Sequence, residues 1–230
     1  AAYTRTGRAF FDESTTAAFL DRLAAAVTAA GVFDELETDW LILDAELLPW
    51  SLKAVGLLQE QFAAVGAAAR AGLAAAGGAL DLAAARGLDV GRLRESTARR
   101  AEDAAAFSAA YRRYVWPVSG LDGVQLAPFQ ILAGAGGTYE EQPHAWHLAL
   151  IDRIVAADPG VLRSTRRLFV DVDDEASRAA GTQWWLDLVG DGGEGMVVKP
   201  AANLSWDAKR RLVQPGMKVR GPDYLRLVYG

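Results

Sequence analysis

The chain has 230 residues, of which 51% are hydrophobic and 23% are charged, and its formal net charge is -5. This composition is typical of a globular protein and excludes a disordered one. The length allows one large domain or two small ones. The acidic balance excludes a protein coated in positive charge, so any nucleic-acid contact has to be local.

Residue types that form cross-links or bind transition metals are scarce. The chain has no cysteine and two histidines, which excludes disulfides and thiolate metal sites and fits a cytoplasmic protein. The first residues lack a signal pattern, and we expect no membrane partner because no apolar run looks long enough to span a bilayer. The Ala-rich stretch at residues 62–80 comes closest, but Arg70 and several glycines interrupt it.

Taken in chain order, the first predicted elements are a strand and a helix. Residues 3–11 are predicted to form a strand, in which Gly7 indicates a bend or a close backbone approach. Ser14 or Thr15 can cap the helix that follows, whose apolar residues recur at helical spacing until Gly31.

The next predicted strand, residues 40–48, carries two carboxylates. Its leucines share one face, and Trp40, Ile42, Asp44 and Glu46 share the other. Because Asp44 and Glu46 are two residues apart on a strand, they project in the same direction. Such a pair suits Mg²⁺ or a ribose hydroxyl, and a solvated sheet edge is the alternative interpretation.

Residues 51–115 differ from the rest in composition and have no strand signal. They are rich in Ala, Leu, Gln, Glu and Arg. We predict a helical insertion of about three helices, with breaks near Gly77-Gly78 and at residues 87–91.

Strands and helices mix in the second half of the chain. A strand is predicted at residues 124–133, where Pro128 indicates a sheet edge or a bulge. Because the elements do not alternate as βαβ units, the predicted fold class is α+β with mainly antiparallel sheet. Helices are predicted at residues 144–157 and 175–189, and strands at 167–172, 196–199 and 217–229, the last turning at 221–223.

Two charged phrases close the chain, EGMVVKP at residues 194–200 and QPGMKVRG at residues 214–221. An ionic group on such an apolar stretch is costly to bury without a partner, so a polyphosphate with its metal or a surface salt-bridge network is expected here. Lys218 and Arg220, two residues apart on one strand face, would bring positive charge to a phosphoryl group.

Three further side chains have competing interpretations. Phe129 could stack on a purine, although most strand phenylalanines belong to the core. His144 and His147, three residues apart on a helix, could share a metal, but a packed or solvent-facing pair is favoured because no third ligand is in view. Lys199 has the opposite strand parity to Glu194, so a regular strand would direct the two to different faces.

The order of five phrases resembles covalent nucleotidyltransferases, which are ATP-dependent DNA and RNA ligases and capping enzymes. The phrases are TRTG at residues 4–7, LDAEL at 43–47, FQIL at 129–132, EGMVVK at 194–199 and KVR at 218–220. Longer versions of these motifs resemble the ligase domain of bacterial polynucleotide kinase-phosphatases, which are RNA-repair enzymes. These longer motifs are DAELLPW, APFQILA and MKVRGPDYLRLVYG, and the insertion at residues 51–115 also suits that family. The resemblance covers nearly the whole chain and implies one adenylyltransferase domain, residues 1–230, of the nucleotidyltransferase fold.

The resemblance also implies ATP and Mg²⁺ or Mn²⁺ as cofactors, and RNA with 5′-phosphate and 3′-hydroxyl ends as substrate. The site residues that it implies are Glu46 for ribose and metal, Phe129 for adenine, Glu194 for metal, Lys218 for the α-phosphate, Lys199 and Arg220 beside the nucleotide, and Arg5 and Arg8 for nucleic acid.

In this family a lysine attacks the α-phosphate of ATP to give lysyl-AMP, and AMP then passes to the RNA 5′-phosphate. The family places that lysine in a Lys-x-x-Gly-x-Arg phrase ahead of the strand that carries Arg5. The lysines here, Lys53, Lys199, Lys209 and Lys218, are not in such a phrase. We therefore expect a fragment that cannot form lysyl-AMP alone and that lacks the kinase and phosphatase domains.

A second hypothesis is a non-catalytic nucleotide-binding or partner-docking module. The Ala-rich residues 63–85 could offer a flat surface for packing another helix. The resemblance implies that the insertion recruits an RNA ribose methyltransferase, so the two hypotheses are compatible.

Overall fold

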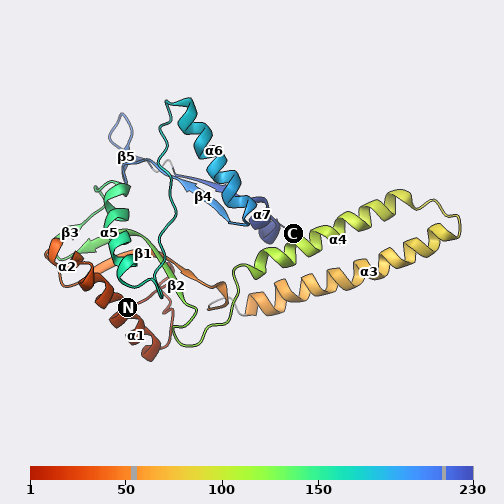
Figure 1. The fold of residues 1–230 in the computed structure, drawn as a ribbon, viewed down its shortest axis with the longest axis horizontal. Helices are drawn as coiled ribbons and strands as arrows, with labels where there is room; N and C mark the ends of the chain where they lie inside the picture. Colours follow the sequence, from red (N-terminus) through yellow and green to blue (C-terminus); the bar gives the residue numbers. More distant parts are fainter. Residues whose placement is uncertain (53–55, 214–215, 230) are drawn as a thin grey trace. The chain divides into compact units, whose positions relative to one another are not determined.

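The computed structural model describes residues 1–52, 56–213 and 216–229 (Figure 1). Lys53 and residues 214 and 215 of the second charged phrase lie outside this description. The chain forms two compact units, each assembled from three segments. Unit 1 comprises Ala1–Pro49, Pro117–Trp184 and Met196–Val219, and unit 2 comprises Trp50–Trp116, Trp185–Gly195 and Arg220–Gly230.

Unit 1 is built on a three-stranded antiparallel sheet in the order β1-β2-β3. The alternating apolar residues of β1 (Leu41–Leu48) form the predicted strand, which pairs along its length with β2 (Gln125–Gly134). The last residues of β2 pair with β3 (Gly137–Thr138). This sheet and the helices around it confirm the predicted α+β class with antiparallel strands.

Phe129 occupies a bulge in β2. Asp44 lies opposite Gln130 and Ala45 lies opposite Pro128, so no β1 residue faces Phe129. Pro128 has no amide hydrogen for the ladder, and the irregularity beside it confirms that its position marks a bulge. Because a bulge redirects a side chain, the direction of Phe129 does not follow from strict alternation along the strand.

Helix α5 (His144–Ala157) packs against β2 of this sheet, and α1 (Glu13–Ala29) packs against α5. Residues of α1, α5 and β2 supply much of the core, including Phe19, Val27, Ile131, Ile151 and Ile154. The N-cap of α1 is Asp12, whose carboxylate accepts the Thr15 amide at 2.8 Å, so the prediction of Ser14 or Thr15 as the cap is wrong. The short helix α2 (Val32–Glu35) follows α1.

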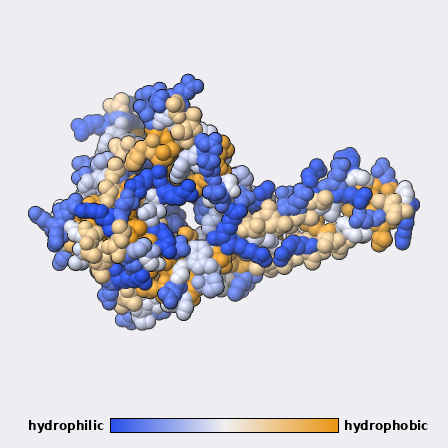
Figure 2. Space-filling model, in the orientation of Figure 1, coloured by the Kyte–Doolittle hydropathy of each residue, from blue (hydrophilic) through white to orange (hydrophobic). Residues whose placement is uncertain are grey.

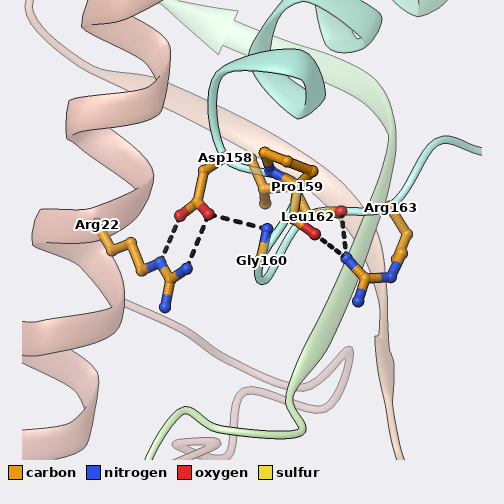
Figure 3. Close-up of polar contacts among 6 residues, drawn as sticks. All are labelled: Arg22, Asp158, Pro159, Gly160, Leu162 and Arg163. Atoms are coloured by element: carbon orange, nitrogen blue, oxygen red, sulfur yellow. Dashed lines mark hydrogen bonds and ion pairs between the residues drawn. The ribbon is translucent and has the colours of Figure 1, made fainter.

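An ion pair ties α1 to the end of α5 (Figure 3). Nη2 of Arg22 donates to Oδ1 of Asp158 at 2.8 Å, and Nε donates to the other carboxylate oxygen. The same carboxylate accepts the amide of Gly160 at 3.1 Å. Nη1 of Arg163 holds the carbonyls of Pro159 and Leu162, so the turn after α5 is fixed from both sides.

Three expected strands of the two units are not regular strands in the structure. Residues 3–11 form a tight turn with a single bridge from Tyr3 to Ala9, because Gly7 has a φ of 78° and reverses the chain. Residues 167–171 have no regular secondary structure, and residue 172 lies in a bend, so the expected strand is not formed. The second half of the closing strand is the helix α7 (Pro222–Tyr229), since Pro222 is pre-organised for the first helical position.

The remaining strands form two small two-stranded sheets, and one further helix precedes them in the sequence. Helix α6 (Glu175–Gly190) and β4 (Gly195–Val198) lie close to their predicted positions, and β4 pairs with β7 (Met217–Arg220) in a two-stranded sheet. A second two-stranded sheet joins β5 (Ser205–Trp206) to β6 (Leu212–Val213).

Unit 2 contains a long helical hairpin. The one-turn helix η1 (Trp50–Leu52) precedes the π-helix η2 (Leu57–Ala63), which continues into α3 (Ala64–Ala85), and α4 (Gly91–Arg112) returns against it (Figure 1). The break predicted at Gly77-Gly78 is wrong, because α3 passes through both glycines, whereas the break at residues 87–91 is confirmed by the turn between the helices. The base of the hairpin packs on α7 around Leu58, Ala110, Tyr111 and Leu227.

The two helices of the hairpin differ in polarity. Figure 2 shows hydrophilic atoms along the α4 side and apolar atoms along the α3 side. By length and composition alone, the helix Leu57–Ala85 is apolar enough to cross a membrane, with a mean hydropathy of 1.3 in its best window, so the expectation that no run is long enough is wrong. Alanine accounts for much of this value, and α4, which packs alongside, carries exposed charged residues.

Candidate active site

Two of the predicted nucleotide-binding side chains meet in unit 1. Nζ of Lys199, just beyond β4, lies 5.1 Å from the centroid of the Phe129 ring, within range of a cation–π attraction. A purine cannot stack on the ring face that the ammonium covers, so binding on that face requires Lys199 to move. Burial, and then the Lys199 charge, lower the pKa of nearby His144.

The carboxylates of β1 lie on the exposed face of the sheet. Burial alternates along the strand, so that Ile42, Asp44 and Glu46 are exposed while their neighbours are partly covered. The alternation is the one predicted from sequence, and it leaves both carboxylate groups accessible. Exposed oxygen donors in this arrangement suit Mg²⁺, which typically takes one or two protein carboxylates and completes its shell with phosphates and water.

In unit 2, the acidic residue of the first charged phrase meets the last cation of the second. Nη1 of Arg220 donates to Oε2 of Glu194 at 3.0 Å, and both side chains are 30% exposed. The amide of Gly221 donates to the Glu194 carbonyl at 2.8 Å, which holds the two backbones together beside the ion pair. The pair keeps the Glu194 carboxylate in one place without burying it.

A chain of aromatic rings supports Arg220. Its guanidinium lies 4.1 Å from the centroid of the Tyr224 ring, and Tyr224 meets Trp50 edge-on at 6.5 Å. Trp50 stacks on Tyr114 at a centroid distance of 4.4 Å. The Tyr114 hydroxyl donates to the Gly192 carbonyl at 3.3 Å. The contacts therefore lead from Arg220 to the turn that precedes Glu194.

The protonation of Tyr114 is set by its surroundings. Burial raises the pKa of Tyr114 to about 12, and the negative charge of Glu194 adds to the effect. The phenol thus stays protonated at neutral pH and remains a hydrogen-bond donor. Because the Glu194 charge contributes to the pKa of Tyr114, the carboxylate and the phenol interact electrostatically.

The other predicted site residues lie apart from these contacts. Lys218 is exposed on β7, and its ammonium forms no ion pair within the part of the chain that the structure describes. Arg5 and Arg8 are exposed in the turn near the N-terminus. Over residues 1–52, 56–213 and 216–229, no group of three acidic or histidine residues forms a metal site. Glu46 and Lys218 belong to unit 1 and Glu194 to unit 2, so their convergence on one nucleotide stays a prediction.

Of the two predicted histidines, His147 is buried and His144 is half-buried. His147 is fully buried, and its Nδ1 accepts the amide of Ile131 at 3.3 Å. Burial lowers the pKa of His147, which keeps the ring neutral. The ring centroids of His144 and His147 are 6.5 Å apart. His147 therefore packs in the core and accepts a hydrogen bond from the backbone of β2.

Sequence reasoning missed four residues around Glu194, namely Trp50, Arg113, Tyr114 and Tyr224. Trp50 and Tyr224 stand inside the quoted phrases DAELLPW and MKVRGPDYLRLVYG, which was a signal that they matter. Arg113 and Tyr114 carry no such signal, because they end a helix that is distant in sequence from the phrases they contact.

Comparison with known proteins places this arrangement in a family. A chain of the solved Pnkp1/Rnl/Hen1 complex has the same fold, with a TM-score of 0.58 at 18% identity over 99% of this chain. The match covers 62% of that chain, so the 230 residues span less than two thirds of its length. No curated protein matches the sequence.

The match to a protein family is more specific than this likeness of fold. A family model described as the PNKP adenylyltransferase domain, ligase domain, matches residues 1–230. It therefore includes β1 and β2, the helical hairpin and the Glu194–Arg220 pair. This chain belongs to the family of PNKP adenylyltransferase (ligase) domains.

Proposed function

We propose that this chain is the adenylyltransferase part of an ATP-dependent RNA ligase that seals healed RNA ends in the cytoplasm. The observation that carries the proposal is family membership over residues 1–230. The pairing of Glu194 with Arg220 supports it, because it brings a carboxylate suited to a metal beside a cation suited to phosphate.

The proposed reaction has three transfers at phosphorus. A lysine nitrogen forms a bond to the α-phosphorus of ATP and loses a proton, while the bond to the β-phosphate oxygen breaks and pyrophosphate leaves. An oxygen of the RNA 5′-phosphate then displaces the lysine nitrogen, which regains a proton. Finally, the RNA 3′-hydroxyl attacks the 5′-phosphate, loses its proton, and releases AMP as the strand is joined.

The residues of this chain would bind and orient ATP for these steps. Phe129 would stack on adenine once Lys199 moves from the ring, and Lys199 would then contact phosphate. Glu46 would hold the ribose and, with Glu194, the Mg²⁺ or Mn²⁺ that balances the phosphate charge. The cations of β7 would face the developing charge on the α-phosphate, with Lys218 nearest to it.

The nucleophile of the first transfer is proposed to lie outside these 230 residues. None of Lys53, Lys199, Lys209 and Lys218 belongs to a Lys-x-x-Gly-x-Arg phrase. The chain alone should therefore bind ATP without becoming covalently labelled. A polypeptide in which such a phrase precedes residue 1 should become labelled.

Two assays test the proposal separately. Titration calorimetry should show binding of Mg·ATP to the 230-residue chain, and the absence of binding would contradict an adenylyltransferase. Incubation with α-labelled ATP and Mg²⁺ should leave the chain unlabelled, whereas a labelled band would mean that one of its own lysines is the nucleophile. In the longer polypeptide, Lys218→Ala should abolish or severely reduce labelling, and normal labelling would refute the role of Lys218.

The exposed side of α3 favours an additional role in docking a partner, which by family resemblance is an RNA ribose methyltransferase. Val65 and Leu82 are 58% and 64% exposed there, and mostly alanine and glycine lie between them. Small side chains let a partner helix approach closely. Substituting both residues with Glu should abolish binding of the methyltransferase and leave Mg·ATP binding intact. Retained binding would contradict the docking role.

A further inference from the structure

Glu194 stands directly after a turn of glycines that the helical hairpin holds in place. The turn, residues 190–193, links α6 to β4, and its amides at Gly192 and Gly193 donate to the carbonyls of Val189 and Leu188 at 3.0 and 2.9 Å. Gly192 has a φ of 82°, a conformation that side chains with a Cβ rarely adopt. The direction in which the chain enters Glu194 therefore depends on this turn.

Arg113, the C-cap residue of α4, lies directly on the turn. Its Nη1 donates to the Asp191 carbonyl at 2.6 Å. A Cβ placed on Gly192 would lie 0.9 Å from that same nitrogen, so the guanidinium occupies the space that a side chain would take. Gly192 is buried under it. The Arg113 guanidinium can therefore occupy this position only because residue 192 is a glycine.

Further contacts fix Arg113 and the turn to the rest of unit 2. Nη2 of Arg113 lies 3.9 Å from the Asp223 carboxylate, which Arg226 also binds at 2.9 Å. The next residue, Tyr114, donates to the Gly192 carbonyl. A Cβ on Gly221 would lie 3.0 Å from the Gly193 carbonyl, so the start of α7 packs closely against the turn as well.

We propose that Arg113 is a positioning residue that sets the place of the Glu194 carboxylate through the glycine turn. The proposal rests on the proposed function, in which Glu194 supports the metal of Mg·ATP. Arg113 touches neither nucleotide nor metal; it binds a carbonyl three residues before Glu194 and fills the space over the intervening glycine. The helical insertion is thereby part of the catalytic framework, because its last turn holds one of the site's carboxylates.

The chemistry of arginine suits this task. The planar guanidinium can donate to a carbonyl and face a carboxylate at the same time, whereas lysine offers one compact ammonium. Residues that orient a metal-binding carboxylate typically contribute tenfold to a hundredfold in metal affinity or activity. We therefore expect Arg113→Ala to weaken Mg·ATP binding about tenfold and Arg113→Lys to restore part of the loss.

The experiment measures Mg·ATP binding by calorimetry in four forms of the 230-residue chain. They are the unaltered chain and the Arg113→Ala variant, each with and without the Glu194→Gln substitution. If Arg113 acts through Glu194, its substitution weakens binding to the otherwise unaltered chain and has no further effect in the Glu194→Gln background. Binding of metal-free ATP should change little. Arg112→Ala, an exposed arginine one residue earlier, is the matched control and should bind Mg·ATP normally.

Three results would overturn the proposal in distinguishable ways. Normal Mg·ATP binding by Arg113→Ala refutes the positioning role, and so does an equal loss in both backgrounds. No Mg·ATP binding by the unaltered chain refutes the proposed function itself. If Arg113→Ala fails to fold, Gly192→Ala replaces it as the test, because the added methyl group displaces the guanidinium. Gly192→Ala must then weaken Mg·ATP binding by the otherwise unaltered chain and have no further effect in the Glu194→Gln background.

Discussion

Arg220 and Glu194 are 26 residues apart in sequence, and their side chains form an ion pair of 3.0 Å in unit 2. Each belongs to one of the two charged phrases that close the chain. The same unit contains the helical hairpin, whereas Glu46, Phe129, Lys199 and Lys218 belong to unit 1. The residues that resemble one nucleotide site are thus divided between two packing units.

Replacing Arg220 with Ala should weaken Mg·ATP binding about tenfold, because Glu194 loses the partner that orients it. The free energy of unfolding should change by less than about 1 kcal/mol, since the pair is partly exposed. Calorimetry and urea unfolding measure the two quantities. Arg211→Ala breaks the exposed pair with Asp207 and should leave binding unchanged. Equal effects of the two variants would contradict a specific role for Arg220.

Phe129→Ala should distinguish stacking on adenine from a role in the core. Loss of a stacking ring should weaken ATP binding roughly tenfold, an effect expected from base–aromatic contacts. Inorganic tripolyphosphate has no base, so its affinity should not change. Phe169→Ala, which removes a ring that is 56% exposed, is the control. A similar loss for ATP and tripolyphosphate would mean that Phe129 maintains the fold and does not read the purine.

Stability should fall in mild acid because of the two histidines. Burial is the main cause that lowers the pKa of both His144 and His147. An unfolded histidine takes up a proton near pH 6.5, whereas the folded groups do so only at lower pH. Their contribution is therefore complete above about pH 6.5 and is lost as the pH falls through the lowered pKa values.

His147→Gln isolates the buried histidine, because glutamine can still accept the Ile131 amide but does not titrate. Urea unfolding at pH 7.5, 6 and 5 should show a smaller decline for the variant than for the unaltered chain. The same decline in both would show that His147 is not the group responsible.

Asp158→Asn should destabilise unit 1 by about 1 kcal/mol, since it removes the ion pair between α1 and the turn after α5. Asp81→Asn breaks the pair with Arg94 at the exposed end of the hairpin and should have a smaller effect. Chemical unfolding measures both. Identical losses would indicate that the tie between α1 and α5 contributes no more than a solvated surface pair.

The sequence predicts helices and strands best where apolar residues recur at one regular spacing along the whole element. Residues 144–157 keep helical spacing throughout and form α5, and residues 41–48 alternate and form β1. The helix at Pro222 was missed because its β-favouring residues suggest a strand, while the proline at the first helical position indicates the opposite. The glycines at residues 77 and 78 do not break α3, because packing against α4 outweighs their poor helix propensity.

The candidate site was predictable only in part. The phrases identify Glu194 and Arg220, but their pairing depends on how β4 and β7 meet. Arg113 has no local signal, since its role comes from the space left by Gly192, a residue 79 positions later in the printed sequence. Contacts between distant segments are set by tertiary packing, which periodicity does not report.

The most direct measurement of the central claim is a crystal structure of this chain with Mg²⁺ and ATP. The account predicts one bound nucleotide, with adenine on Phe129, the metal beside Glu46 and Glu194, and the α-phosphate beside Lys218. A nucleotide bound elsewhere, with these side chains directed to unrelated surfaces, would contradict the account.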